Sequence, residues 1–200
     1  MSGKTREDAW DLMTEYTASE SLRRHMLAVE VAMRAYARKF GEDEETWGIV
    51  GLLHDFDYEQ HPNPEAKPDP NEHPLFGSAV LKDQGYSEEV IHAIQTHADY
   101  LSLPRETKME KTLFAVDELS GFITAATFVR PDKNIEGLEV KSVRKRMKDK
   151  AFARAVSRED IVQGAEELGV PLDEHIQFVI DAMQSIAPEL GLAGSAPAPA

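Results

Sequence analysis

The chain has 200 residues, of which 42% are hydrophobic and 29% are charged, and its formal net charge is −14. This composition is typical of a globular protein, and we expect one domain over residues 1–190 and a disordered tail over residues 191–200. The absence of cysteine excludes disulfides and thiolate chemistry, so any metal must be bound by imidazole and carboxylate ligands.

Charge and hydropathy also limit the partners of the chain. A strongly acidic protein repels the phosphate backbone of a long nucleic acid, so we expect a small substrate instead. That substrate can still be phosphorylated, because a bound cation reverses the potential inside a pocket. No apolar run approaches the roughly 20 residues that span a bilayer, and MSGKTREDAW lacks the apolar core of a secretory signal. We expect a cytoplasmic protein with no membrane partner, and its oligomeric state stays open.

Apolar residues recur at three- and four-residue steps along most of the chain, which is the period of amphipathic helices. No alternating pattern is long enough to predict a sheet, so the expected fold is all-α. Gly41 and Ser87 are suited to end one helix and to begin another. The pattern predicts helices over residues 6–16, 21–40, 43–56, 74–85, 87–97, 109–128, 158–168 and 172–186.

Several polar side chains fall where these helices require apolar ones. His54 and Asp55 end an almost wholly apolar segment, His97 lies on an apolar helix face, and Asp117 stands among core residues. His25 borders the apolar stripe of its helix. Burying such groups is costly unless a partner compensates, and a divalent metal ion would do so. The alternative is a set of core polar residues that are satisfied by hydrogen bonds.

A proline-rich segment separates the His54-Asp55 doublet from the next candidate ligand, His73. Residues 61–74, HPNPEAKPDPNEHP, contain five prolines in fourteen residues and predict an extended loop near the mouth of a site. His73 lies at its far end. Adjacent residues on a helix point about 100° apart, so His54 and Asp55 need further ligands from other elements. Alternatively, His73 is a capping or loop residue and His97 an ordinary core histidine.

The order His25, His54-Asp55, Asp117 on predicted helices resembles the HD-domain metal-dependent phosphohydrolase superfamily over residues 21–122. Two further histidines between the doublet and the last aspartate resemble its dinuclear branch. The resemblance implies an HD-like helical bundle. One ion would take His25, His54, Asp55 and Asp117, and the other would take His73, His97 and the second oxygen of Asp55.

This resemblance also implies a reaction. A metal-bridged hydroxide would attack a small phosphomonoester, nucleotide or phosphodiester, with Asp55, His73 and His97 as the catalytic residues. Imidazole and carboxylate ligands suit Fe, Mn, Co, Ni or Zn, and suit Mg less well. The same ligands also serve diiron oxygenases of the superfamily, which is one alternative function. A non-catalytic module that binds a nucleotide is another.

The chain departs from the resemblance after the doublet, where it reads HDFDYEQ without the basic residue of an Ile-Gly-Lys continuation. A GYP motif is also absent, which argues against cyclic-di-GMP as the substrate. Phosphate contacts must then come from elsewhere, and a basic region after residue 128 is the candidate, although it also fits a solvated helix face. Its candidate residues are Arg130, Lys133, Lys141, Arg144 and Lys145.

The remaining histidines, His61, His92 and His175, carry no spacing argument, and we expect them not to bind metal. Asp57 and Glu59 follow the doublet closely. They either accept protons near the site or lie in a solvated loop.

Overall fold

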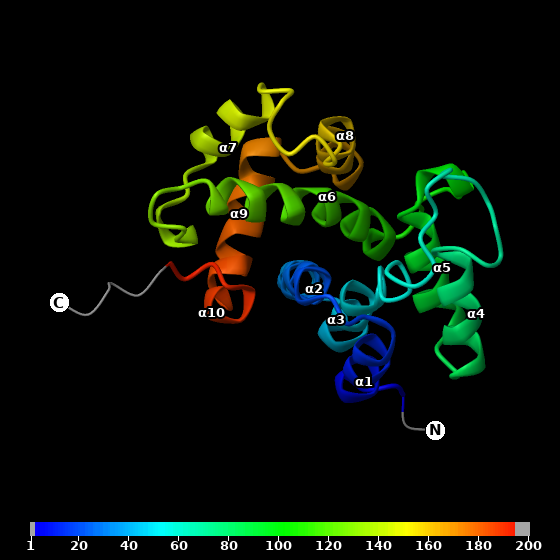
Figure 1. The fold of residues 1–200 in the computed structure, drawn as a ribbon. Helices are drawn as coiled ribbons and strands as arrows, with labels where there is room; N and C mark the ends of the chain where they lie inside the picture. Colours follow the sequence, from blue (N-terminus) through cyan, green and yellow to red (C-terminus); the bar gives the residue numbers. More distant parts are fainter. Residues whose placement is uncertain (1–2, 195–200) are drawn as a thin grey trace. The chain divides into compact units, whose positions relative to one another are not determined.

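The computed structural model describes residues 3–194, and every regular element in that part of the chain is a helix (Figure 1). This confirms the predicted all-α fold. The described residues form two compact units, one ending at Phe114 and the other beginning at Ala115. The expectation of one domain over residues 1–190 stays a prediction.

The first unit contains five α-helices, a 3-10 helix and the start of a long helix that continues into the second unit. These are α1 (Arg6–Tyr16), α2 (Glu20–Phe40), α3 (Glu44–Leu53), α4 (Leu75–Asp83), α5 (Glu88–Thr96), η1 (Asp99–Leu101) and α6 (Lys108–Phe128). The second unit contains the rest of α6, followed by η2 (Ile135–Gly137), α7 (Val140–Met147), α8 (Arg158–Leu168), α9 (Leu172–Gln184) and α10 (Ala187–Leu190).

Helix ends follow the capping residues of the sequence. Asp43 and Ser87 accept hydrogen bonds at the first turns of α3 and α5, and Gly41 ends α2 with a φ of 71° in the left-handed region. The helix predicted over residues 43–56 is shorter than expected. It ends at Leu53, so His54 is the C-cap and Asp55 lies in the turn that follows.

Helices α2 and α3 pack side by side at very short distance (Figure 1). A Cβ added to Gly51 on α3 would lie 2.9 Å from the Cα of Glu30 and 3.0 Å from the Cγ of Met33 on α2. Such contact requires a residue with no side chain. This close packing brings the end of α3, and with it His54, against α2.

The turn after α3 is tied to the loop between α1 and α2. Thr17 donates its buried hydroxyl to the carbonyl of Phe56 at 2.8 Å. The Glu59 carboxylate accepts from the backbone amides of Ala18 and Ser19 at 3.0 and 2.9 Å. Glu59 is therefore a structural anchor of the turn, and not only a solvated loop residue. These bonds hold the turn that carries Asp55.

The proline-rich loop is closed at its base. The amide of His73 donates to the carbonyl of His61 at 2.7 Å, which joins the two ends of the loop. Inside the loop, the Asn63 side-chain amide donates to the carbonyls of Lys67 and His73 at 2.7 and 3.1 Å. An extended, proline-rich segment therefore still delivers His73 to a defined position.

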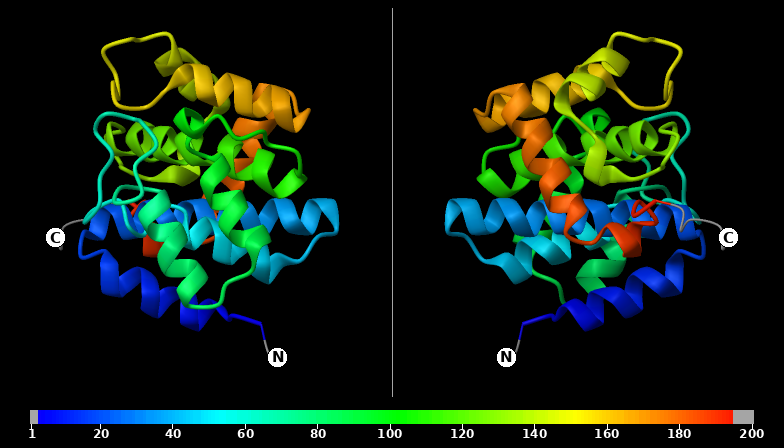
Figure 2. Two further views of the ribbon diagram at one scale, coloured as in Figure 1. Left: turned by 90° about the vertical axis from the view of Figure 1, so that its right-hand side faces the viewer. Right: turned by 90° about the vertical axis from the view of Figure 1, so that its left-hand side faces the viewer.

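In the second unit α9 packs against α7, α8 and α10 (Figure 2). Gly164 of α8 approaches α6 so closely that an added Cβ would lie 2.6 Å from the Cα of Ala115. The basic segment forms its own helix, α7, and a short α10 follows α9. The sequence indicated α7 only as a solvated helix face without bounds, because it has one buried residue, Val143, and α10 was not predicted, because it has four residues in all.

The expected disordered tail is wrong for its first residues. Leu192 is fully buried, and its carbonyl accepts from the amide of Ile135 at 2.9 Å. An apolar side chain that finds a buried position orders the backbone on either side, so residues 191–194 belong to the fold. Residues 195–200 lie outside the described part. Among the described residues no helix has the length and apolar character that a bilayer span requires.

We predict that Gly51→Ala lowers the free energy of unfolding by about 1–3 kcal/mol, because the new methyl group must push α2 and α3 apart. Gly121→Ala on α6 is the matched control. Its Cβ would meet no atom within 4 Å, so this variant should be neutral or up to about 1 kcal/mol more stable. Denaturant unfolding measures both, and equal losses would contradict the packing argument.

Candidate metal centre

Five of the six predicted ligands lie together in the first unit. His25 lies on α2, His54 caps α3, Asp55 lies in the next turn, His73 precedes α4, and His97 caps α5. They form two groups that could each hold an ion, one of His25, His54 and Asp55 and the other of Asp55, His73 and His97. Within each group the ligand atoms lie within 4.8 Å of one another.

Asp55 belongs to both groups through different oxygens. Its Oδ2 faces the Nε2 atoms of His54 and His25 at 3.5 and 3.8 Å. Its Oδ1 faces the Nε2 atoms of His73 and His97 at 3.4 and 3.6 Å. One carboxylate therefore lies between two pairs of imidazoles, as a residue that bridges two metal ions must.

The tautomers of three histidines follow from their other ring nitrogens. Nδ1 of His54 donates to the Gly51 carbonyl at 2.8 Å, Nδ1 of His97 donates to the Ile94 carbonyl, and Nδ1 of His73 donates to Asp57 at 2.7 Å. A neutral imidazole that donates through Nδ1 carries a lone pair on Nε2. In all three, that lone pair is on the nitrogen that faces the cluster.

These lone pairs test whether the residues fit a metal. Nε2 of His73 lies 3.2 Å from Nε2 of His97, and Nε2 of His54 lies 3.3 Å from Nε2 of His25. When both rings of the first pair are neutral, both atoms are acceptors, so they cannot bond each other and repel unless a cation compensates. The side chains of His54 and His73 are buried, which strengthens this repulsion. The donor set therefore fits divalent metal ions.

The electrostatics of Asp55 agree with its role as a ligand. Burial acts to raise the pKa of Asp55, but in the metal-free chain the positive charge of protonated His54 and His73 and hydrogen bonds from His54 and His97 outweigh that effect and hold this pKa well below its ordinary value. Asp55 is therefore ionised near neutral pH, as a metal ligand must be.

The sixth predicted ligand, Asp117, lies on α6 in the second unit and is partly buried. Its contribution to the first ion stays a prediction.

The three histidines expected not to bind metal have protein partners instead. His61 stacks on Phe76 with ring centroids 3.4 Å apart, and His92 contacts the Glu110 carboxylate at 2.8 Å. His175 is fully buried and donates to the Ala115 carbonyl at 2.8 Å. Among residues 3–194, none of the three belongs to a group that could hold an ion.

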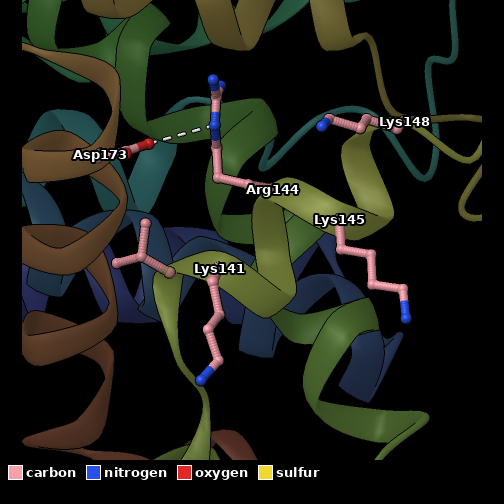
Figure 3. A pocket seen from close by; sticks show the side chains of 6 residues that line it. Lys141, Arg144, Lys145, Lys148 and Asp173 are labelled. Atoms are coloured by element: carbon pink, nitrogen blue, oxygen red, sulfur yellow. Dashed lines mark ion pairs between the residues drawn. The ribbon is translucent and has the colours of Figure 1, made fainter.

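The predicted phosphate-binding residues separate into two sets. Lys141, Arg144 and Lys145 lie on α7 and line a surface hollow of about 550 Å³ together with Val140, Lys148 and Asp173 (Figure 3). Arg144 contacts Asp173 at 3.2 Å and Lys141 contacts Glu139 at 2.7 Å.

Arg130 and Lys133 are not among the residues that line this hollow. The Arg130 guanidinium bonds Asp132 and the Gly137 carbonyl, so its donors already hold the turn after α6. Lys133 lies in that turn with a φ of 49°.

Sequence reasoning missed two residues that hold His73. The Tyr100 hydroxyl donates to the His73 carbonyl at 2.7 Å, and Asn63 donates to the same oxygen. Burial raises the pKa of Tyr100 to about 12, so this hydroxyl keeps its proton over the physiological range. No sequence pattern marks either residue, because both bond a backbone carbonyl, which is the same for any residue at position 73. Asp57, by contrast, could be noticed in the sequence, since it lies two residues after the doublet ligand Asp55.

We predict that the protein binds two divalent ions, that His97→Ala binds one, and that Asp55→Ala binds neither firmly, because only Asp55 contributes to both groups. Metal analysis after dialysis and calorimetric titration measure the stoichiometry. A free ion concentration 100 times the dissociation constant should stabilise the wild type by about 2.7 kcal/mol for each occupied site. His92→Gln is the matched control and should bind both ions. Identical metal loss in His97→Ala and Asp55→Ala would contradict the bridging position of Asp55.

Comparison with known proteins agrees with this geometry. No match was found among curated proteins or among solved structures. The model of the HD domain family matches residues 22–121, half of the chain, and this range contains all six predicted ligands. The chain belongs to the HD domain family.

Proposed function

We propose that this protein is a dinuclear metal-dependent phosphohydrolase that acts on a small phosphomonoester, nucleotide or phosphodiester. One observation carries the proposal, namely that the two oxygens of Asp55 each face a separate pair of histidine Nε2 atoms. Membership of a family of metal-dependent phosphohydrolases supports the same reaction.

The charge of the ligand set favours an anionic substrate. Four of the five clustered ligands are imidazoles, which bind metal in their neutral form, so divalent ions would keep most of their positive charge. This centre would attract a phosphate group although the whole chain carries a net charge of −14. When bound, the ions supply an activated water and stabilise negative charge on a phosphoryl oxygen.

The protein itself contributes position and protonation state. Backbone carbonyls and Asp57 engage Nδ1 of three imidazoles, so Nε2 is the nitrogen that each ring presents to a metal ion. His25 and Asp55 are the less buried members of the cluster, with side chains 21% and 18% exposed. A substrate therefore has access on the side of these two residues.

The test is an assay of the purified protein with a panel of phosphomonoesters, nucleotides and phosphodiesters in Mn, Co, Ni, Fe and Zn. We expect phosphate release that chelation abolishes and metal restores, and a loss of at least 100-fold in kcat for Asp55→Ala. Oxygen uptake with two bound irons and no phosphate release would instead identify a diiron oxygenase. Ligand binding without turnover would identify a nucleotide-binding module.

We also propose that Lys141, Arg144 and Lys145 contact the substrate phosphate. All three line the hollow on α7, where the Arg144 guanidinium can offer paired donors to a phosphate. A charge-assisted hydrogen bond contributes about 1.5–3 kcal/mol.

Arg144→Gln should therefore lower kcat/KM by about 10- to 100-fold, mainly through a higher KM, with metal stoichiometry unchanged. Lys111→Gln, on α6, removes an equivalent surface charge as a control. Steady-state kinetics give kcat/KM for the two variants. An equal kcat/KM in both would show that α7 is only a solvated basic face.

A further inference from the structure

Asp57 is a buried carboxylate whose two oxygens are both engaged. Its side chain is 1% exposed. Oδ1 accepts from Nδ1 of His73 at 2.7 Å, and Oδ2 accepts from the backbone amide of Gly77 at 2.7 Å. A buried charge is costly without such partners, so this arrangement needs a reason beyond packing.

The partner of His73 differs in kind from those of His54 and His97. The latter two cap helices, and each donates Nδ1 to the carbonyl three residues earlier in its own chain segment. His73 follows the proline-rich loop and has no helical turn before it, so no local carbonyl can orient its ring. Its Nδ1 partner comes from 16 residues earlier in the chain.

Gly77 fits this role for a physical reason. It lies in the first turn of α4, where backbone amides lack helical partners and the helix dipole favours negative charge. An added Cβ would lie 2.7 Å from both Cγ and Oδ2 of Asp57. Only glycine allows the amide to reach the carboxylate, so α4 and the turn after α3 are joined through Asp57.

We propose that Asp57 is the positioning residue of the second ion site: it orients His73, fixes its Nδ1–H tautomer and makes Nε2 a stronger ligand. A carboxylate behind a ligating histidine raises the basicity of that ligand, and loss of such a partner costs about 10- to 100-fold in metal affinity. This inference rests on the two-ion site of the proposed function. In the first group, by comparison, Nδ1 of His54 donates to the neutral Gly51 carbonyl.

The experiment is titration of metal-free full-length protein with Zn²⁺ and Co²⁺ by calorimetry and by cobalt absorption. Asp57→Asn keeps the size of the side chain but removes its charge and places an amide group where two acceptor oxygens are needed. We expect the affinity of one site to fall about 10- to 100-fold while the other site keeps its wild-type affinity.

Glu59→Gln is the matched control. Glu59 also accepts backbone amide bonds in this turn, but the hydrogen bonds of its carboxylate go to Ala18 and Ser19 and not to a histidine. This variant should keep both affinities, because a single oxygen of Glu59 accepts both amide bonds and the glutamine amide oxygen can replace it. Wild-type affinity at both sites of Asp57→Asn would overturn the proposal, and so would an equal loss at both sites.

A second measurement needs no variant at position 57. Nitrogen-15 NMR of labelled histidine in the metal-free wild type should show the Nδ1–H tautomer for His73, assigned by its loss in His73→Gln. An Nε2–H tautomer would overturn the proposal.

The two hypotheses also fail separately. If the wild type binds two ions but hydrolyses no phosphoester, the proposed function fails and the role of Asp57 stands. If the wild type hydrolyses phosphoesters but Asp57→Asn binds both ions normally, only the role of Asp57 fails.

Discussion

The Asp55 carboxylate lies among four imidazole nitrogens, and the rest of the first unit can be understood as the framework that keeps it there. In their neutral forms, His73 and His97 present Nε2 lone pairs to each other at 3.2 Å. Such an arrangement is unfavourable without a cation. The arrangement persists because helix packing, capping and loop closure each stabilise the position of a ligand independently.

Three kinds of support hold the ligands. Close packing at Gly51 brings the end of α3 against α2, and so brings His54 to His25. Backbone carbonyls of α3 and α5 orient His54 and His97 locally. His73 depends instead on Asp57 behind its ring, on Asn63 of its own loop and on Tyr100, the last two bonding its carbonyl. The ligand with the least local structure therefore has the most tertiary support.

Much of the fold could be predicted from the sequence. Helical periodicity and caps located eight of the ten α-helices in the described residues, because amphipathic patterns and capping residues are local properties. α7 was indicated only without bounds and α10 was missed, because a mostly exposed basic helix and a four-residue helix leave almost no apolar period. The buried Leu192 was missed because the pattern of the tail is low in complexity, and only a partner at Ile135 gives that residue a place in the core.

For the site, the sequence alone determined the kind of ligands, their order and the family, because imidazole and carboxylate groups in apolar surroundings indicate metal binding by themselves. Tertiary structure decided which oxygen of Asp55 faces which histidines, and which nitrogen of His54, His73 and His97 faces the cluster. It also showed that Asp57, whose role the sequence left open, is the hydrogen-bond partner of His73. These properties depend on side chains from four separate elements that come into contact only in the folded chain. The spacing of residues along the sequence does not predict those contacts.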